Sequence, residues 1–283
     1  MDAITTGITP PLVRAPLWPD HDGARMTRDF LFWRHLRVLR ARVMRHVHRI
    51  AGHTGLVQTA YGVPMHANWD DRTYAYCHYG TYGTYLADLI GAIDTPFLFL
   101  DIGANQGLFS LVAARNPACE AIVALEPVPG THARLARNFD GNGLSARAQA
   151  LNFGLSDREG THHIATSTRH SGVATLERHL ALRDPNAIAV AVEMRTVEGL
   201  APYLRDDLPI FVKIDVEGHE AQVIAQLLGS PLADRIIAIF YEHDCKWSDG
   251  AAIEGNLAQA GFAVTRRYGR GRHFDALALP VRA

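Results

Sequence analysis

The sequence predicts an α/β fold in which helices cover both faces of a mostly parallel sheet. From residue 97 onward, short apolar runs alternate with helical segments, a pattern typical of buried parallel strands. Two of these runs end in an acid beside glycine or proline, DIGA at 101–104 and LEP at 125–127. The chain of 283 residues is long enough to bury a large core. We therefore predict an N-terminal extension, residues 1–90, followed by an α/β domain, residues 91–283.

The extension divides into three stretches. Residues 1–25 are rich in proline, glycine and acids, and predict a poorly ordered arm. Residues 27–50 predict a basic amphipathic helix, with six arginines between apolar residues at helical spacing. Such a helix could contact an anionic membrane or a second subunit, or pack on its own domain. Residues 56–85 are rich in tyrosine and glycine, which predicts short strands and turns or a lid over a cleft.

The α/β domain is predicted element by element from its apolar runs. A helix ends where proline or glycine follows it, and a strand ends where an acid or a turn follows it. The predicted strands are 97–102, 121–127, 147–157, 210–214, 235–244, 262–269 and 273–280, and the predicted helices are 108–116, 131–141, 219–228 and 256–260. Residues 158–179 are polar and predict a hairpin and loop. The GRGR turn at 269–272 predicts a final hairpin, and with it an antiparallel edge to the sheet.

The turn after the first predicted strand indicates the cofactor. Its glycines, Gly103 and Gly107, are spaced G-x-x-x-G, whereas a dinucleotide-binding turn has G-x-G-x-x-G. Asp101 ends the strand, and a carboxylate there opposes a pyrophosphate but suits the ammonium and sulfonium of S-adenosylmethionine. Glu126, at the end of the second strand, is placed to accept hydrogen bonds from two ribose hydroxyls. Together these features favour S-adenosylmethionine over a nicotinamide cofactor.

Four segments in order, DIGANQGLFS, ALEPVPGTHARLARNFDGNGL, LSDREG and VKIDVEGHE, make the sequence similar to the FkbM family of S-adenosylmethionine-dependent methyltransferases. The resemblance covers roughly residues 97–242. It implies the class I methyltransferase fold, a Rossmann-like sheet of seven strands with the last one antiparallel. It also implies O-methylation of a carbohydrate or natural-product hydroxyl.

The resemblance carries over to specific residues. The methionine part of the cofactor would lie along the first turn, the ribose at the end of the second strand, and the adenine beside residues 152–157. The implied cofactor-binding residues are Asp101, Gly103, Ala104, Asn105, Gly107, Glu126, Pro127, Gly154, Leu155 and Asp157.

The segment KIDVEGHE, residues 213–220, predicts the catalytic groups. It holds Lys213, one of only two lysines in the chain, followed by Asp215 and His219. Strand ends meet at one edge of an open sheet, so we expect these side chains to lie near Glu242, which ends the next strand. Methyl transfer to a hydroxyl needs a base, and His219, Asp215 and Glu242 all remain candidates. Lys213 either pairs with the acids as a structural cation or hydrogen-bonds a substrate oxygen.

Several alternatives stay open. A divalent metal held by two or three of Asp215, His219, Glu242, His243 and Asp244 is not favoured, and no metal ligand is assigned. A nicotinamide oxidoreductase, or a non-catalytic protein that docks through residues 27–50, would be the other classes of function.

The expected partner is a small-molecule or glycan acceptor, and the chain is expected to form homo-oligomers. The net charge of −1 makes a nucleic-acid substrate unlikely. The sequence has no signal-peptide pattern and an odd number of cysteines, so we expect a cytoplasmic protein.

Overall fold

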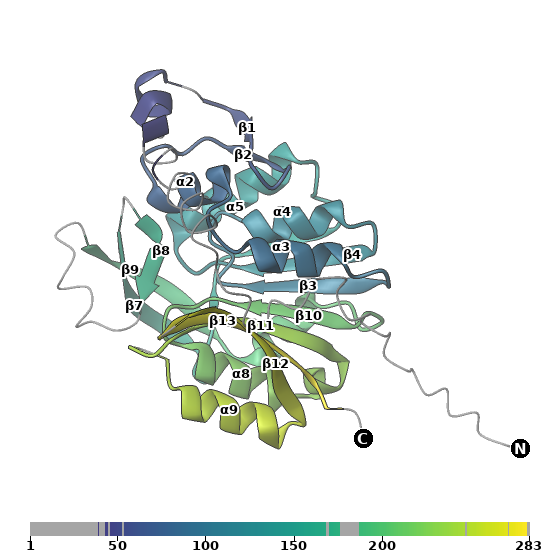
Figure 1. The fold of residues 1–283 in the computed structure, drawn as a ribbon. Coiled ribbons are helices and arrows are strands. Elements are labelled where there is room, and N and C mark those ends of the chain that lie inside the picture. The colour runs from purple at the N-terminus through teal and green to yellow at the C-terminus, as the bar shows by residue number, and fades with distance from the viewer. Residues whose placement is uncertain are drawn as a thin grey trace, which may run out of the picture.

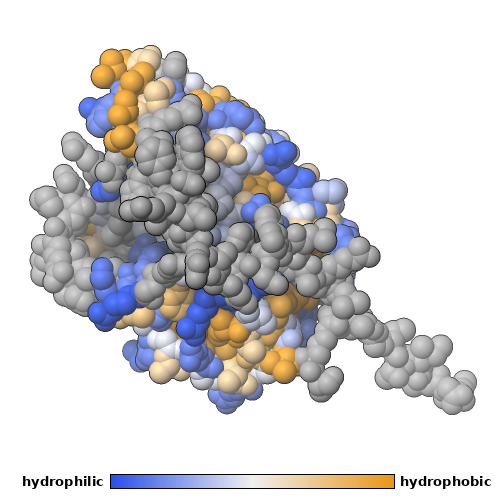
Figure 2. All heavy atoms as spheres, viewed as in Figure 1, coloured by the Kyte–Doolittle hydropathy of each residue, from blue (hydrophilic) through white to orange (hydrophobic). Residues whose placement is uncertain are grey.

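The computed structural model describes residues 39, 43–44, 46–52, 54–167, 170–175, 187–246, 248–270 and 272–281. The predicted arm, residues 1–25, and most of the predicted helix 27–50 lie outside these residues. The described part of that helix is helical over residues 46–50 and exposes several apolar side chains, including Val47 and Ile50. Figure 2 shows apolar atoms at the top of the molecule, where this helix lies in Figure 1. No helix among the described residues is long and apolar enough to cross a membrane.

The centre of the molecule is a seven-stranded sheet (Figure 1). The five strands on one side are parallel to one another, and the last strand of the chain is antiparallel to both of its neighbours. In spatial order the strands are β12 (Phe262–Arg270), β13 (His273–Pro280), β11 (Ile236–Asp244), β10 (Ile210–Ile214), β3 (Phe97–Ile102), β4 (Cys119–Leu125) and β5 (Ala148–Leu151). This confirms the predicted sheet. The predicted final hairpin and antiparallel edge are confirmed, because β12 forms the edge and pairs antiparallel with β13, which lies inside the sheet.

Two layers of helices cover the sheet. The helices α3 (Thr84–Gly91), α4 (Leu108–Arg115) and α5 (Pro129–Gly141) lie on one face, and α8 (Glu220–Leu228) and α9 (Gly250–Gln259) lie on the other (Figure 1). Successive side chains of a strand point to opposite faces. Accordingly, Phe97 and Phe99 of β3 pack with α3 to α5, whereas Leu98 and Leu100 pack with α8 and α9. Every residue of β3 is buried, which explains its continuous apolar sequence.

A second, four-stranded sheet lies beside the first, in the order β6 (Gly154–Leu155), β9 (Ala187–Arg195), β7 (Gly160–Ser167) and β8 (His170–Thr175). The predicted hairpin in residues 158–179 is confirmed, because β7 and β8 pair antiparallel. The predicted single strand 147–157 is wrong, because it divides into β5 and β6. Between them, the Asn152 side chain donates to the carbonyl oxygens of Glu126 and Pro127 and holds the chain at the end of β4. Two short helical segments, α7 (Val197–Leu200) and the 3₁₀ turn Ala201–Tyr203, then lead towards β10.

The Tyr-rich segment packs against the sheet. It begins with the predicted short strands, β1 (Leu56–Gln58) and β2 (Pro64–His66), which form a hairpin. The two helices that follow, α2 (Arg72–Tyr79) and α3, were not predicted. Asp71 caps the N-terminus of α2 by accepting from Thr73 N, and this start signal is visible in the sequence. Met65 and Tyr74 join Phe99 in one hydrophobic cluster, so residues on both sides of position 90 share a core.

Candidate active site

The loop between β3 and α4 is a tight turn at the end of the first parallel strand. Gly103 and Gly107 have φ of 76° and 88°, in the left-handed region that favours glycine. A Cβ on Gly103 would lie only 1.9 Å from the carbonyl oxygen of Asp215. Because that atom belongs to the backbone, it cannot move aside as a side chain can. Glycine at position 103 therefore lets the loop lie directly against the end of β10.

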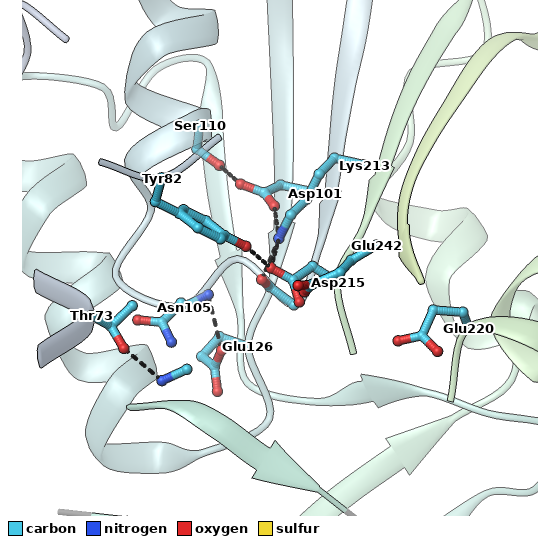
Figure 3. Close-up of polar contacts among 12 residues, drawn as sticks. Thr73, Tyr82, Asp101, Asn105, Ser110, Glu126, Lys213, Asp215, Glu220 and Glu242 are labelled. Carbon is cyan, nitrogen blue, oxygen red and sulfur yellow. Dashed lines mark hydrogen bonds and ion pairs between the residues drawn. The ribbon is translucent and has the colours of Figure 1, made fainter. Parts of the chain in front are cut away.

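Lys213 connects the ends of β3 and β10 (Figure 3). It lies opposite Asp101 in the parallel pairing, and only 5% of its side chain is exposed. Its Nζ lies 3.3 Å from Asp101 Oδ1 and 3.7 Å from Asp215 Oδ2, and it donates to Gly103 O at 2.6 Å. Burial alone would lower the pKa of Lys213, but Asp101 and Asp215 outweigh burial and raise it. The ammonium therefore keeps its proton and stays charged between the two carboxylates.

A cavity of about 270 Å³ opens at the carboxyl ends of β3, β4 and β10. This is the edge of an open α/β sheet at which ligands bind. Its wall is mostly apolar, with a few polar groups, as is usual for small-molecule sites. The predicted site residues on this wall are Gly103, Ala104, Asn105, Glu126, Pro127, Gly154, Leu155, Lys213, Asp215, His219 and Glu242.

Three predicted cofactor-binding residues, Asp101, Gly107 and Asp157, do not line the cavity. Asp101 is fully buried, and its Oδ2 accepts from Ser110 Oγ at 2.7 Å while its Oδ1 faces Lys213. Its charge is therefore compensated within the protein, whereas the sequence argument placed it against the cationic donor. Gly107 packs against α5, because a Cβ there would lie only 2.5 Å from Leu135 Cδ1.

Glu126 presents a buried carboxylate to the cavity (Figure 3). Its Oε2 accepts from Asn105 N at 3.0 Å and its Oε1 accepts from Val128 N at 2.9 Å. Burial raises the pKa of Glu126 to about 7, although both hydrogen bonds oppose that shift. Each carboxylate oxygen keeps a lone pair beyond these two bonds. The group can therefore accept hydrogen bonds from two further hydroxyls, such as those of a ribose diol.

Three carboxylates meet beside Lys213 at the same cavity: Asp215, Glu217 and Glu242. One oxygen of each lies within 4.8 Å of the others. Burial alone would raise the pKa of Asp215, but Lys213 and hydrogen bonds from Glu242 and Tyr82 lower it. Burial and the charge of Asp215 raise the pKa of Glu242 to about 8. Asp215 is thus the carboxyl that is held ionised, and Glu242 is the neighbour that binds its proton more tightly.

Comparison with known protein families decides the assignment. The family model described as the methyltransferase FkbM domain matches residues 101–264, which is more than half of the chain. The chain belongs to the FkbM methyltransferase family. Its α/β domain is therefore a class I, S-adenosylmethionine-dependent methyltransferase domain, as the sequence predicted.

Individual relatives of this FkbM chain are distant. The methyltransferase sdnD of Sordaria araneosa is 30% identical over 162 residues, which span 48% of this chain and 62% of that protein. The crystal structure of methyltransferase FkbM from Methylobacillus flagellatus is 13% identical, with a TM-score of 0.44 over 65% of this chain and 43% of that one. The ribosomal protein L11 methylase of Lactobacillus delbrueckii subsp. bulgaricus is 15% identical, with a TM-score of 0.41 over 71% of this chain and 80% of that one.

The residues of the FkbM site fit S-adenosylmethionine. Glu126 offers oriented acceptors for the ribose, and the turn at Gly103 leaves room for a close approach of the ligand. Gly154 is held against Met194, because a Cβ there would lie 2.6 Å from Met194 Sδ. Both residues line the cavity together with Pro127 and make this part of its wall apolar.

His219, a predicted base, lines the FkbM cavity near β6. Its Nε2 lies 3.0 Å from Ser156 Oγ, next to the strand β6. Of the alternative metal set, the structure brings Asp215 and Glu242 together, with Glu217 as the third carboxylate. The other candidates have other contacts: His243 Nε2 lies 3.3 Å from Cys245 Sγ, and Asp244 pairs with His273.

Several residues of this site were missed in the sequence. Tyr82 hydrogen-bonds Asp215 across 133 positions, and only its place in a Tyr-rich segment pointed to the cavity. Glu217 lies within KIDVEGHE, and its φ of 51° marks it as a strained position. His273 Nε2 lies 2.8 Å from Glu242 Oε1, which raises the pKa of His273 to about 9. Nothing local predicts that contact, because it depends on β13 pairing with β11.

Proposed function

We propose that this methyltransferase transfers the methyl group to a hydroxyl of a carbohydrate or another natural product. The observation that carries the proposal is the hydrogen bond from Tyr82 OH to Asp215 Oδ2, 2.5 Å long, at the wall of the cavity (Figure 3). A hydroxyl already donates its proton to this carboxylate. An acceptor hydroxyl that reached the same oxygen would be positioned as a nucleophile beside the turn between β3 and α4, residues 103–107, which we call the donor loop.

The residues of the site divide the work between binding and proton transfer. When bound, S-adenosylmethionine supplies an electrophilic methyl group and a neutral thioether as leaving group. Glu126 would hold the ribose of the donor. Asp215 would accept the hydroxyl proton while the acceptor oxygen forms its bond to the methyl carbon. Lys213 keeps Asp215 ionised, and Glu242 is the second candidate base, active once it loses its own proton above pH 8.

Donor binding tests the first half of the proposal. We expect Glu126→Gln to weaken S-adenosylhomocysteine binding about tenfold or more, because an amide offers one acceptor oxygen where the carboxylate offers two. Isothermal titration calorimetry gives the affinity. The matched control is Glu120→Gln on the same strand, whose exposed carboxylate pairs with Arg205 and should leave binding unchanged. Equal affinity of the Glu126 variant and the wild type would remove the ribose assignment.

Turnover tests the second half. Incubation with a donor carrying an isotopically labelled methyl group and a panel of glycosides and polyketide alcohols should yield a product one labelled methyl heavier, detected by mass spectrometry. Asp215→Asn should lower kcat by about 10² to 10⁴ without a matching loss of donor affinity. Methylation of nitrogen or carbon only, on every acceptor that reacts, would refute O-methylation.

A chelator separates base catalysis from metal assistance. We expect EDTA to leave turnover unchanged, because Asp215 needs no metal to accept a proton. Loss of activity with EDTA and recovery with Mg²⁺ would instead assign Asp215, Glu217 and Glu242 as metal ligands.

A further inference from the structure

Asp71 is a buried carboxylate that the mechanism above does not use. The residue is only 3% exposed, although it lies at the N-terminus of a surface helix. Its Oδ1 accepts from Thr73 N at 2.9 Å and from Ser171 N at 3.1 Å. Its Oδ2 lies 2.5 Å from both Gln106 Nε2 and Ser171 Oγ, and each of these groups donates to it. One side chain therefore binds three separate parts of the chain.

These three parts are the donor loop itself and two segments beside it. They are the start of α2, the turn between β3 and α4, and β8, and they lie 35 and 100 positions apart. A further hydrogen bond joins α2 to β8, from Gly172 N to Thr73 Oγ1 at 2.8 Å. The side-chain amide of Asn105 lies 3.0 Å from Ser171 Oγ, whose single proton is donated to Asp71. In Figure 3, Thr73 lies close to Asn105 and Glu126. Thr73, Asn105, Gln106 and Ser171 all line the cavity.

Capping of α2 alone does not require this arrangement. A cap needs one acceptor for the first free N–H groups of the helix, and it works at the surface. Asp249, at the N-terminus of α9, does so with an exposed side chain that accepts from Ala252 N at 3.0 Å. Burying a carboxylate is unfavourable unless several donors compensate it. The additional hydrogen bonds that Asp71 accepts come from side-chain and backbone groups of the donor loop and of β8.

We propose that Asp71 is a positioning residue for the donor site. It holds Gln106, and through Ser171 also Asn105, in the loop conformation that the donor needs, and it fastens β8 over the cavity. The effect reaches the ribose position, because Asn105 N donates to Glu126 Oε2 at 3.0 Å. Loss of Asp71 frees the loop, so the loop must be ordered again each time the donor binds. The inference rests on the proposed donor site.

The test measures binding and stability separately in the full chain. Isothermal titration calorimetry gives the Kd for S-adenosylhomocysteine, and thermal melting without ligand reports folding. We expect Asp71→Ala to raise the Kd about tenfold or more, because it leaves several buried donors unpaired. Asp71→Asn should restore part of the affinity, since an amide oxygen can still accept from Thr73 N and Ser171 N. The matched control, Asp249→Ala, removes a cap distant from the loop and should leave the Kd unchanged.

The outcomes are distinct. The proposal is supported if the Kd is highest for Asp71→Ala, intermediate for Asp71→Asn and lowest for the wild type. A Kd for the folded Asp71→Ala variant within twofold of wild type overturns it, and a lower melting temperature alone would then show a purely structural cap. If Asp71→Ala does not fold, Ser171→Ala decides, with a Kd raised about threefold expected and an unchanged Kd contrary to the proposal. Failure of the wild-type protein to bind would refute the donor site itself.

Discussion

Lys213 compensates two buried carboxylates, and this makes it a strong determinant of stability. Its Nζ lies within 4 Å of both Asp101 and Asp215, with almost no access to water. Removing one partner of a buried ion pair leaves the other charge uncompensated. We expect Lys213→Met to lower the free energy of unfolding at pH 7 by about 3–5 kcal/mol, measured by urea denaturation.

The other lysine supplies the control. Lys246 is exposed, so Lys246→Met should change stability by less than about 0.5 kcal/mol. A loss below about 1 kcal/mol for Lys213→Met would contradict the role of the ammonium as the charge that compensates both carboxylates.

For individual residues, the sequence predicted their positions along the strands, but it did not predict the orientation of their side chains. Asp101, Glu126, Lys213 and Asp215 each end a predicted strand, and the structure does gather them at one edge. The sequence did not show that Asp101 points away from the cavity. That follows from the pairing of β3 with β10, which sets Lys213 beside Asp101.

At the scale of elements, the contact between the β3–α4 turn and the end of β10 fixes the shape of the site. Gly103→Ala adds a methyl group 1.9 Å from a carbonyl oxygen at a residue with φ of 76°. We expect the loss of stability to exceed that of Gly143→Ala by about 1–3 kcal/mol. Gly143 has a similar φ of 66° and open space around its Cβ position, so it isolates the cost of the left-handed backbone.

Urea denaturation of both variants gives the difference directly. Equal losses for the two glycines would show that the turn can move away from β10 without cost. Donor affinity should fall in the Gly103 variant only, because the Gly143 turn follows α5 and is not part of the cavity wall.

Helices and strands with a clear apolar pattern could be predicted from the sequence. Those whose structure depends on contacts with segments far away in the sequence could not. The strands β3, β4, β10 and β11 are mostly apolar because both faces of the sheet are covered, and the sequence shows these apolar runs directly. The helix α2 has a weakly apolar, Tyr-rich sequence, and its structure depends on packing against the sheet. The interior place of β13 depends on its pairing with both β11 and β12, which no local pattern reveals.

For the molecule as a whole, the buried acids predict a stability that falls from pH 6 to pH 9. Burial raises the native pKa of Glu126 and Asp275 to about 7, and burial and Asp215 raise that of Glu242 to about 8. The native state therefore holds protons that the unfolded state loses above pH ~4, so stability falls as pH rises from about 4 and levels off once pH passes the native pKa values of about 7 and 8. His273, with its pKa raised to about 9 by Glu242, adds stability that is lost as pH rises from about 6.5 through 9.

Urea denaturation of the ligand-free protein at several pH values checks this trend. Asp275→Asn should stabilise the protein at pH 8 by about 1 kcal/mol or more and flatten the profile, because the amide has no proton to lose. Asp157→Asn, at an exposed carboxylate, is the control and should leave the slope unchanged. Stability that is constant or increases between pH 6 and pH 9 would contradict the prediction.

The interior position of β13 has a consequence for biosynthesis. A ribosome makes the chain from its N-terminus, so β3, β4 and β10 exist before the segment that carries His273 and Asp275. Until that segment pairs with β11, the carboxylate of Glu242 lacks its imidazole neighbour. The acidic centre around Glu242 is therefore complete only after the last strand of the chain has been made and has joined the sheet.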